Sequence, residues 1–229
     1  MLYVVATPIG NLKDISLRAL EVLKNVDLIL CEDTRVTKKL LNYYNIKTPV
    51  LSYHSYSKLR RINYILDLLS QKKKIALVCD AGTPGISDPG EKLISLIKSK
   101  IPDTKIVPIP GPCALITALC ISGIPSDRFL FLGFLPKKKK RKKFIKRIIE
   151  EEIPVVFYES PYRILPTLRE IKENLEKENI SKNVIVFKEL TKKFENRFEG
   201  SFDKVIKELE NQKIKGEFVV IVYTLIYAD

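Results

Sequence analysis

Residues 74–90 read Lys-Ile-Ala-Leu-Val-Cys-Asp-Ala-Gly-Thr-Pro-Gly-Ile-Ser-Asp-Pro-Gly, an apolar run followed by a loop rich in glycine and proline. The run Lys74–Cys79 predicts a buried strand, and residues 80–89 predict a stiff loop. Glycine lets a backbone approach a ligand closely, and proline fixes the loop without adding donors. Asp88 and Glu91 have the spacing of a capping box, which predicts that a helix follows.

The same alternation of short apolar runs and amphipathic stretches extends to both sides. This rhythm predicts an α/β domain whose mainly parallel sheet carries helices on both faces. The expected strands are Leu2–Ala6, Asp27–Cys31, Pro49–Ser52, Lys74–Cys79 and Thr104–Pro108. The expected helices are one from a cap at Ser16 to about Asn25, Thr34–Tyr44, Leu59–Ser70 and one ending near Lys100.

Residues 109–112, Ile-Pro-Gly-Pro, form the clearest hinge, so we expect two α/β domains, 1–111 and 112–229. The second domain should have a mixed sheet, because two of its strands follow each other without a helix between them. Its expected strands are Phe129–Gly133, Val155–Tyr158, Val184–Lys188, Arg197–Gly200 and Glu217–Leu225. Its expected helices are Ala114–Ser122, Lys137–Glu152, Pro161–Glu178 and Phe202–Asn211.

The composition is strongly basic. Lys and Arg number 40 against 27 acidic residues, giving a net charge of +13. This charge favours a polyanionic partner such as nucleic acid or an anionic membrane surface. Codon bias in a genome rich in A and T is the alternative explanation, because most of the cations are Lys.

Cysteine spacing and hydropathy exclude other classes of protein. The cysteines at 31, 79, 113 and 120 form no C-x-x-C pair, so we expect buried free thiols in a reducing cytoplasm rather than zinc or disulfides. No metal-ligand cluster is visible, and no metal is expected. The longest uncharged run, residues 106–126, contains four prolines, so no transmembrane helix is expected. The apolar N-terminus has no basic leader, so no secretory signal is expected.

Three turn-rich loops follow apolar strands, at 7–11, 80–90 and 108–112. Loops at the carboxyl ends of parallel strands line the ligand crevice of an open sheet. These loops match neither a dinucleotide fingerprint nor a Walker A motif, so nucleotide triphosphate hydrolysis has no support. They predict a pocket for a small ligand, walled by backbone.

Carboxylates also follow predicted strands. Glu32 and Asp33 follow one, and Glu159 follows another. Such carboxylates serve a site in some proteins, but Asp33 is equally suited to capping a helix, and Glu159 to pairing with Arg163 at the surface. The residue pattern alone leaves both interpretations open.

The chain resembles the ribosomal RNA small subunit methyltransferase I family of the tetrapyrrole methylase superfamily. The resemblance rests on motifs in the expected order over nearly the whole chain. They are Tyr-Val-Val-Ala-Thr-Pro-Ile-Gly-Asn-Leu at 3–12, Cys-Glu-Asp-Thr-Arg at 31–35, Asp-Ala-Gly-Thr-Pro-Gly-Ile-Ser-Asp-Pro-Gly at 80–90, Ile-Pro-Gly-Pro at 109–112, Phe-Leu-Gly-Phe-Leu-Pro at 131–136, Tyr-Glu-Ser-Pro-Tyr-Arg at 158–163 and Glu-Leu-Thr-Lys at 189–192. One position departs, because the family has His where this chain has Tyr162.

The resemblance implies two α/β domains with S-adenosylmethionine in the cleft between them. It also implies a homodimer that methylates the ribose 2′-oxygen of a cytidine in the decoding region of 16S rRNA, within the small ribosomal subunit. The implied cofactor-binding residues are Pro8, Ile9, Asp80, Ala81, Thr83, Cys113, Ala114 and Tyr158.

The reaction implied by the resemblance is an in-line displacement that needs alignment first and a proton acceptor second. The candidates for the proton acceptor are Glu32, Asp33 and Glu159. The rival functions are methylation of a small tetrapyrrole or a protein side chain by the same fold, and non-catalytic RNA binding. The basic excess disfavours a small substrate, and the intact loops disfavour a non-catalytic protein.

Two further features carry RNA hypotheses. The basic run Lys137–Lys143 is expected to contact RNA phosphates, against the alternatives of a solvated loop or a membrane-surface helix. His54, the only histidine, is expected to be structural or to contact RNA rather than to act as a base. Tyr53 and Tyr56 beside it are candidates for stacking on bases, or for ordinary core and rim positions.

Overall fold

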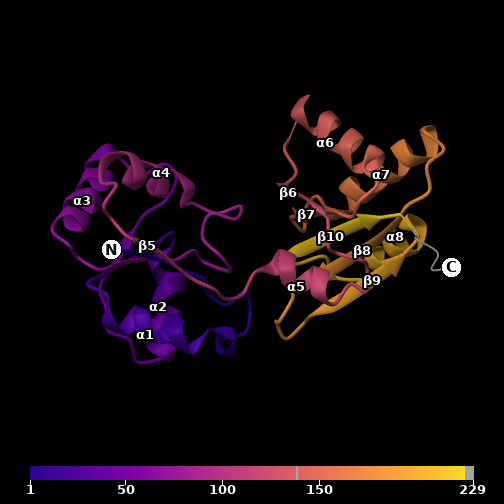
Figure 1. The fold of residues 1–229 in the computed structure, drawn as a ribbon. Helices are drawn as coiled ribbons and strands as arrows, with labels where there is room; N and C mark the ends of the chain where they lie inside the picture. The colour runs from indigo at the N-terminus through magenta and orange to yellow at the C-terminus, as the bar shows by residue number, and fades with distance from the viewer. Residues whose placement is uncertain (138, 225–229) are drawn as a thin grey trace. The chain divides into compact units, whose positions relative to one another are not determined.

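The computed structural model describes residues 1–137 and 139–224 of the chain (Figure 1). The chain divides into two compact units, Met1–Cys113 and Ala114–Asp229. The boundary predicted from the Ile-Pro-Gly-Pro hinge lies just before this division, between Gly111 and Pro112.

The first unit contains a five-stranded sheet in the order β3-β2-β4-β1-β5, and every strand pair in it is parallel, as predicted. Its strands are β1 (Leu2–Val5), β2 (Leu28–Cys31), β3 (Val50–Ser52), β4 (Ile75–Leu77) and β5 (Ile106–Ile109). Its helices are η1 (Leu12–Asp14, a 3-10 turn), α1 (Leu17–Asn25), α2 (Thr34–Tyr43), α3 (Leu59–Ser70) and α4 (Glu91–Lys100).

Helices cover both faces of this sheet because both faces of each strand are apolar. In β2, Ile29 and Cys31 pack into the cluster that contains the buried residues of α1 and α2. Leu30, between them, packs into the cluster that contains those of α3 and α4. Successive side chains of a strand point to opposite faces, so a continuous apolar run needs cover on both sides. Figure 1 shows α1 and α2 on one side of this sheet and α3 and α4 on the other.

Local caps fix where the helices begin. The Ser16 hydroxyl accepts a hydrogen bond from the backbone N–H of Ala19 at 3.1 Å, which confirms the predicted cap of α1. The capping box predicted for α4 is wrong, because the residue that precedes this helix is Gly90 and no side chain caps it. Gly90 has φ 157°, and a Cβ there would lie 3.3 Å from the backbone of Gly85 and the side chain of Leu77. Gly90, rather than Asp88, therefore occupies the N-cap position of α4.

The second unit contains a five-stranded sheet in the order β6-β7-β10-β8-β9. The β6–β7 pair is parallel and the other pairs are antiparallel, so the sheet is mixed, as predicted. Its strands are β6 (Leu130–Phe134), β7 (Val155–Glu159), β8 (Asn183–Lys188), β9 (Asn196–Gly200) and β10 (Phe218–Tyr223). Its helices are α5 (Ala114–Cys120), α6 (Lys139–Glu150), α7 (Ile164–Lys177) and α8 (Phe202–Glu210). Lys138 and Leu225, at the ends of a predicted helix and strand, lie outside the described residues.

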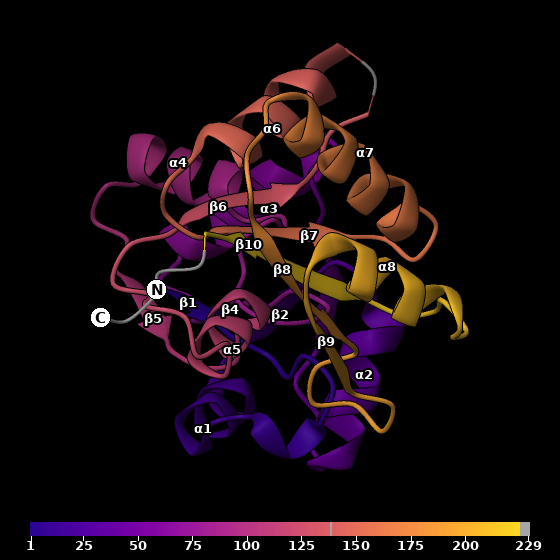
Figure 2. The same ribbon diagram turned by 90° about the vertical axis from the view of Figure 1, so that its right-hand side faces the viewer.

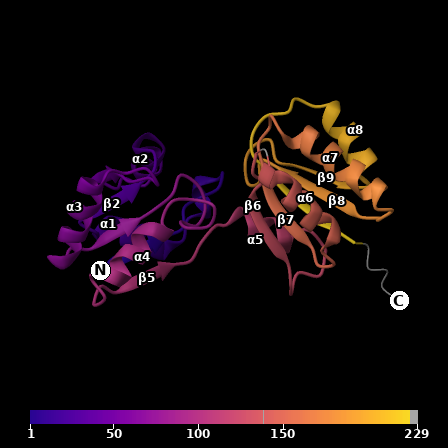
Figure 3. The ribbon, with the colours of Figure 1, turned by 90° about the horizontal axis from the view of Figure 1, so that it is seen from above.

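Three helices of this unit, α6, α7 and α8, share one apolar core with one face of the sheet (Figures 2 and 3). The opposite face carries α5, which polar contacts hold at both ends. The backbone N–H of Leu115 donates to the Tyr158 hydroxyl at 3.1 Å. Arg197 donates to the carbonyls of Ile121 and Ser122, at 2.8 and 3.0 Å, just beyond the last turn. These carbonyls have no partners within the helix, so a cation satisfies them well.

The cysteine expectation holds in part. All four cysteines are free, and Cys31 and Cys79 are buried, but Cys113 is half-buried and Cys120 is exposed. Cys120 is the last residue of α5 and lies on its outer side, so the apolar character of its segment did not predict its burial. Within the described residues, no helix has the length and apolar character that crossing a bilayer requires.

The Ser16 cap provides a test of how α1 is stabilised. Replacing Ser16→Ala leaves an N–H of the first turn without its partner and should lower the free energy of unfolding by about 1 kcal/mol. Ser16→Asp keeps an accepting oxygen and should remain close to wild type. Urea denaturation of the three proteins measures the difference, and equal stability of Ser16→Ala and wild type would contradict the assigned role of the cap.

Candidate active site

The carboxyl edge of the first sheet gathers the predicted loops. In the order β3-β2-β4-β1-β5, the chain leaves β2 toward β3 on one side and leaves β4 toward β5 on the other. Connections that diverge in this way open a crevice between the two strand ends, where ligands bind in open α/β sheets. The loops that follow β2 and β4, which begin at Glu32 and Val78, meet there.

The loops after β1 and β4 are joined by a short antiparallel bridge. The Thr7 N–H donates to the Gly82 carbonyl at 2.8 Å, and the Gly82 N–H donates to the Thr7 carbonyl at 3.0 Å. The buried Thr7 hydroxyl also donates to the Cys79 carbonyl at 3.0 Å. Gly82 has φ 86°, a conformation that residues with a Cβ rarely adopt. Thr7 therefore holds the loops after β1 and β4 together. This role was not predicted from the sequence, although the position of Thr7 directly after a buried strand could have indicated it.

The loop after β5 joins the same assembly. The Thr83 hydroxyl donates to the Pro112 carbonyl at 3.1 Å. A Cβ on Gly111 would lie 3.0 Å from the Cβ of Ala6, so this glycine lets the two loops approach each other closely. The three predicted loops therefore form one connected edge.

Most predicted cofactor residues of the first unit lie along this edge. Pro8 and Asp80 line one small pocket of about 50 Å³, together with Thr37 and Cys79. Ile9 lies next to Gly82, since a Cβ on that glycine would be 3.5 Å from the Ile9 side chain. The predicted residues Ala81 and Thr83 flank the same glycine, and Cys113 follows the Pro112 carbonyl that Thr83 contacts.

Three carboxylates occupy the crevice between β2 and β4. The backbone N–H of Asp33 donates to Asp80 Oδ1 at 3.0 Å, which ties the two loops together. Partial burial raises the pKa of the exposed Glu32 carboxyl above its ordinary 4.5, and the negative charge of Asp80 raises it further. Glu32 is thus an accessible carboxylate with increased basicity.

Asp33 has a different environment. Its side chain caps α2 by accepting from the Arg35 N–H at 2.8 Å, and it pairs with the Arg35 guanidinium at 2.6 Å. Hydrogen bonds from Arg35 lower the pKa of Asp33 to about 2. A carboxylate so stabilised is a weak base.

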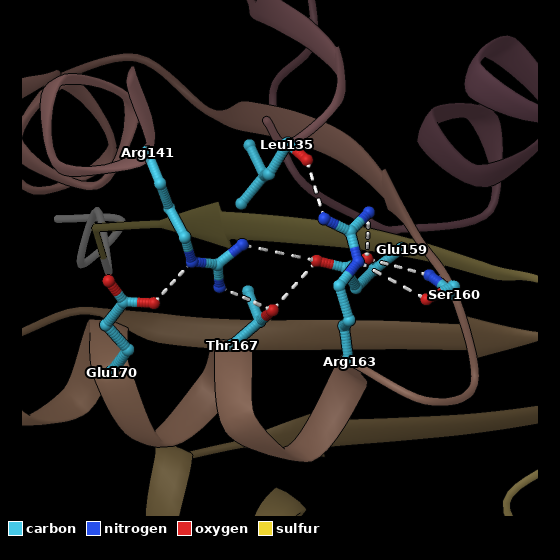
Figure 4. A network of polar contacts seen from close by, with 7 residues as sticks. All are labelled: Leu135, Arg141, Glu159, Ser160, Arg163, Thr167 and Glu170. Atoms are coloured by element: carbon cyan, nitrogen blue, oxygen red, sulfur yellow. Dashed lines mark hydrogen bonds and ion pairs between the residues drawn. The ribbon is translucent and has the colours of Figure 1, made fainter. Parts of the chain in front are cut away.

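Glu159 lies at the end of β7 and is buried in an ion-pair network (Figure 4). Its Oε1 pairs with Arg163 at 2.8 Å and accepts from the Ser160 N–H at 2.8 Å. Its Oε2 accepts from the Thr167 hydroxyl at 2.8 Å and lies 3.8 Å from Arg141. Both oxygens of Glu159 therefore already have partners.

The same network fixes the segment before the basic helix. Arg163 also donates to the Leu135 carbonyl at 2.8 Å, and Arg141 pairs with Glu170 at 2.6 Å (Figure 4). Glu159 thus connects β7, α6 and α7 through two guanidinium groups. Such a buried network positions the elements around it, because leaving any one charge unpaired would be costly.

Tyr158 and Ala114, the predicted cofactor residues of the second unit, are close in space. The Tyr158 hydroxyl accepts from the N–H of Leu115, the residue after Ala114. The Tyr158 ring makes edge contacts with Phe131 and Phe134, with ring centroids 5.1 and 5.4 Å away. Tyr158 is therefore held by aromatic contacts at the start of α5.

The basic run is only partly a free surface. Lys140, Lys142 and Lys143 are exposed on α6, but Arg141 turns inward to Glu170 and Thr167. The expectation that the whole run contacts phosphate is therefore corrected at Arg141. Lys138 lies outside the described residues.

The two tyrosines beside His54 have different environments. Tyr53 is 3% exposed and belongs to the core beneath α3 and α4. Of its two predicted roles, the core position is confirmed and stacking on bases is wrong. Tyr56 is 90% exposed. His54 organises a tight turn, because its Nδ1 accepts from the Tyr56 N–H at 3.2 Å.

Known proteins show where this architecture recurs. The family model of the tetrapyrrole (corrin/porphyrin) methylases matches residues 1–206. A ribosomal RNA small subunit methyltransferase I from Thermotoga maritima is 44% identical over 220 residues, covering 96% of each chain. One from a Hydrogenobaculum species is 47% identical over 224 residues, covering 96% of this chain and 94% of that protein. The X-ray structure of cobalt precorrin-4 methyltransferase, a cobalamin biosynthetic enzyme, has the same fold, with a TM-score of 0.73 at 15% identity over 97% of this chain and 94% of that one.

The Glu159 network provides a stability test. Glu159→Gln removes the negative charge that Arg163 and Arg141 share and should lower the free energy of unfolding by about 3 kcal/mol. The control Asp203→Asn breaks an exposed pair with Lys172 and should change stability little. Urea denaturation measures both, and a Glu159→Gln variant as stable as the control would show that the network does not hold the unit together.

Proposed function

Because the chain belongs to the tetrapyrrole methylases and, among them, to the proteins named ribosomal RNA small subunit methyltransferase I, we propose that it methylates 16S rRNA with S-adenosylmethionine as donor. We further propose that the acceptor is the ribose 2′-hydroxyl of a cytidine in the decoding region. The observation that carries the proposal is the exposed Glu32 carboxylate of raised pKa, set beside Asp80 at the carboxyl edge of the first sheet.

The residues of this edge fit the methyl donor. S-adenosylmethionine supplies an electrophilic methyl group on a positively charged sulfonium, and it also carries an ammonium group. Asp80 and Glu32 are negative groups that would stabilise those charges. A Cβ on Gly85 would meet nothing within 4 Å, so the loop presents its backbone to open space. We assign the contacts to Pro8, Ile9, Asp80, Ala81 and Thr83, and further contacts to Cys113, Ala114 and Tyr158.

The stiffness of the edge serves the alignment that the reaction needs. A displacement at carbon requires the attacking oxygen and the leaving group to be in line, and correct placement supplies roughly 7–11 kcal/mol of the barrier in favourable cases. The Thr7–Gly82 bridge and the Thr83–Pro112 contact fix three loops against one another. These contacts would hold the donor-binding residues in place before either substrate arrives.

Glu32 is the proton acceptor that we propose among the three carboxylates. A ribose hydroxyl is a weak acid, so its attack is helped by a base within hydrogen-bond reach. Asp33 is engaged in capping α2, and both oxygens of Glu159 have partners in a buried network. Glu32 is exposed, and its raised pKa makes its carboxylate a stronger base than that of Asp33.

An RNA substrate also agrees with the charge of the chain. The net charge of +13 favours a polyanion, and Lys140, Lys142 and Lys143 of α6 are exposed. We also propose a homodimer, because the family resemblance implies one. Sedimentation of the purified chain measures its oligomeric state.

The role of Glu32 predicts a specific loss of activity. Glu32→Gln should lower kcat about 100-fold or more while leaving donor binding in place, because an amide cannot accept the proton. The acid limb of the wild-type kcat profile should fall at a pH above 4.5 and disappear in the variant, since only ionised Glu32 acts. Asp33→Asn is the control: Asn caps helices as well as Asp does, so its kcat should stay near wild type. Equal losses in both variants would remove Glu32 from this role.

Transfer of labelled methyl groups tests the reaction itself. The wild type should label one ribose in the decoding region when given S-adenosylmethionine with 30S subunits or protein-free 16S rRNA, and ribose-methyl mapping locates it. Calorimetry should show donor binding by the wild type and a clear loss with Asp80→Ala. Donor binding without label on either RNA would redirect the assignment to a tetrapyrrole or protein substrate, and absence of binding would favour a non-catalytic RNA-binding protein.

A further inference from the structure

A basic and aromatic groove lies beside the candidate active site, within the first unit. It has a volume of about 860 Å³ and lies between the end of β3 and the first turns of α3. Its lining includes His54, Tyr56, Lys58, Arg60, Arg61 and Tyr64. Nothing in the proposed methyl-transfer chemistry uses these residues.

The charge of the groove has one sign. Lys58, Arg60 and Arg61 line it, and no acidic residue is among its described lining residues. Within the described part of the chain, no ion pair engages Lys58 or Arg60. Arg61 is oriented by a hydrogen bond from its guanidinium to the Ser52 carbonyl at 2.5 Å. Cations that are left unneutralised around a hollow favour an anionic occupant.

The aromatic residues narrow the class of that occupant. Tyr56 is 90% exposed and Tyr64 is 52% exposed, so water reaches both rings. The turn that carries Tyr56 is fixed, because the Ser57 hydroxyl accepts from the His54 N–H at 2.9 Å and the Ser57 N–H donates to the His54 carbonyl at 2.8 Å. Exposed rings alternating with Arg and Lys are typical of surfaces that stack unpaired bases and contact the phosphates between them.

The groove adjoins the backbone of Glu32, the residue that we propose as proton acceptor. Ser52, a lining residue, donates from its hydroxyl to the backbone carbonyl of Glu32 at 3.3 Å. A positive charge on His54 would lower the pKa of the Glu32 carboxyl, opposing the effects of burial and of Asp80. A ribose held at Glu32 would therefore have the neighbouring nucleotides of its strand within reach of the groove.

We propose that this groove binds the unpaired RNA nucleotides that flank the target ribose, with Lys58 and Arg60 on phosphates and Tyr56 stacked on a base. The proposal rests on the proposed function, since it names the part of the surface that holds the RNA substrate. It differs from the expectation for the basic helix α6, which lies in the other unit.

Binding of a short fluorescein-labelled oligocytidylate over a salt series tests the charges. The variant Lys58→Gln/Arg60→Gln should reduce the slope of log affinity against log salt by about 1.4, because each phosphate contact on a single strand contributes roughly 0.7. The matched control Lys98→Gln/Lys100→Gln removes the same charge from the exposed end of α4 and should keep the wild-type slope. Equal slopes in both double variants would overturn the proposal.

The stacking contact has its own test. Tyr56→Ala should weaken oligocytidylate binding by about 5- to 100-fold, whereas Tyr56→Phe keeps the ring and should bind as wild type does. In the methyl-transfer assay, Tyr56→Ala should raise KM for RNA and leave KM for S-adenosylmethionine unchanged. Wild-type binding by Tyr56→Ala would overturn the proposal.

The outcomes separate this proposal from the proposed function. If the wild type methylates RNA and the groove variants bind oligocytidylate normally, only the groove proposal fails. If the wild type transfers no methyl group to RNA, the proposed function fails, and the binding series still decides the groove. If Lys58→Gln/Arg60→Gln loses binding to anionic lipid vesicles but keeps its RNA slope, the groove serves a membrane and the proposal is overturned.

Discussion

The pair of backbone hydrogen bonds between Thr7 and Gly82 is the contact on which the candidate site depends most. Parallel strands end at one edge, and the loops that leave them carry polar backbone groups that must find partners. The bridge satisfies such groups in two loops at once and joins the loops that follow the parallel strands β1 and β4. Gly82 is needed there because its φ of 86° is strained for other residues. Thr83 and Gly111 then bring in the third loop, so one local constraint organises the edge.

In the second unit, a buried ion-pair network around Glu159 holds the end of a strand against its neighbouring helices. Glu159 ends β7 in a buried position and is neutralised by Arg163, which directly precedes α7, and by Arg141 of α6 (Figure 4). A carboxylate this well paired holds elements together, and both of its oxygens already have partners. Glu32, with a similar place at a strand end, remains exposed. Two carboxylates that look alike in sequence therefore have different roles because their surroundings differ.

Charge is distributed unevenly in the first unit. Carboxylates gather where β2 and β4 end, and cations gather around the groove at the start of α3. The carboxylates suit the positively charged donor, and the cations suit a phosphate chain. One negatively charged and one positively charged surface within one unit agree with the proposed enzyme, which would bring a cationic donor to a polyanionic acceptor. The net charge of the chain does not show it.

The sequence alone determined the strands, the helices and the two sheet types, because hydrophobic periodicity and the Gly-Pro loops are local properties. Leu59–Ser70 agrees with α3 at both ends, and Ser16 caps α1 as predicted. Tertiary structure decided which side chains are buried and which partners they contact, because the local sequence pattern does not specify these properties. Gly90 and not Asp88 precedes α4, at a point where a Cβ would lie close to Gly85 and Leu77, and after β3 Tyr56 is exposed while Tyr53 is in the core. The distinction among Glu32, Asp33 and Glu159, and the groove beside Glu32, arise from residues distant in sequence. Only their meeting in space sets burial, partners and pKa.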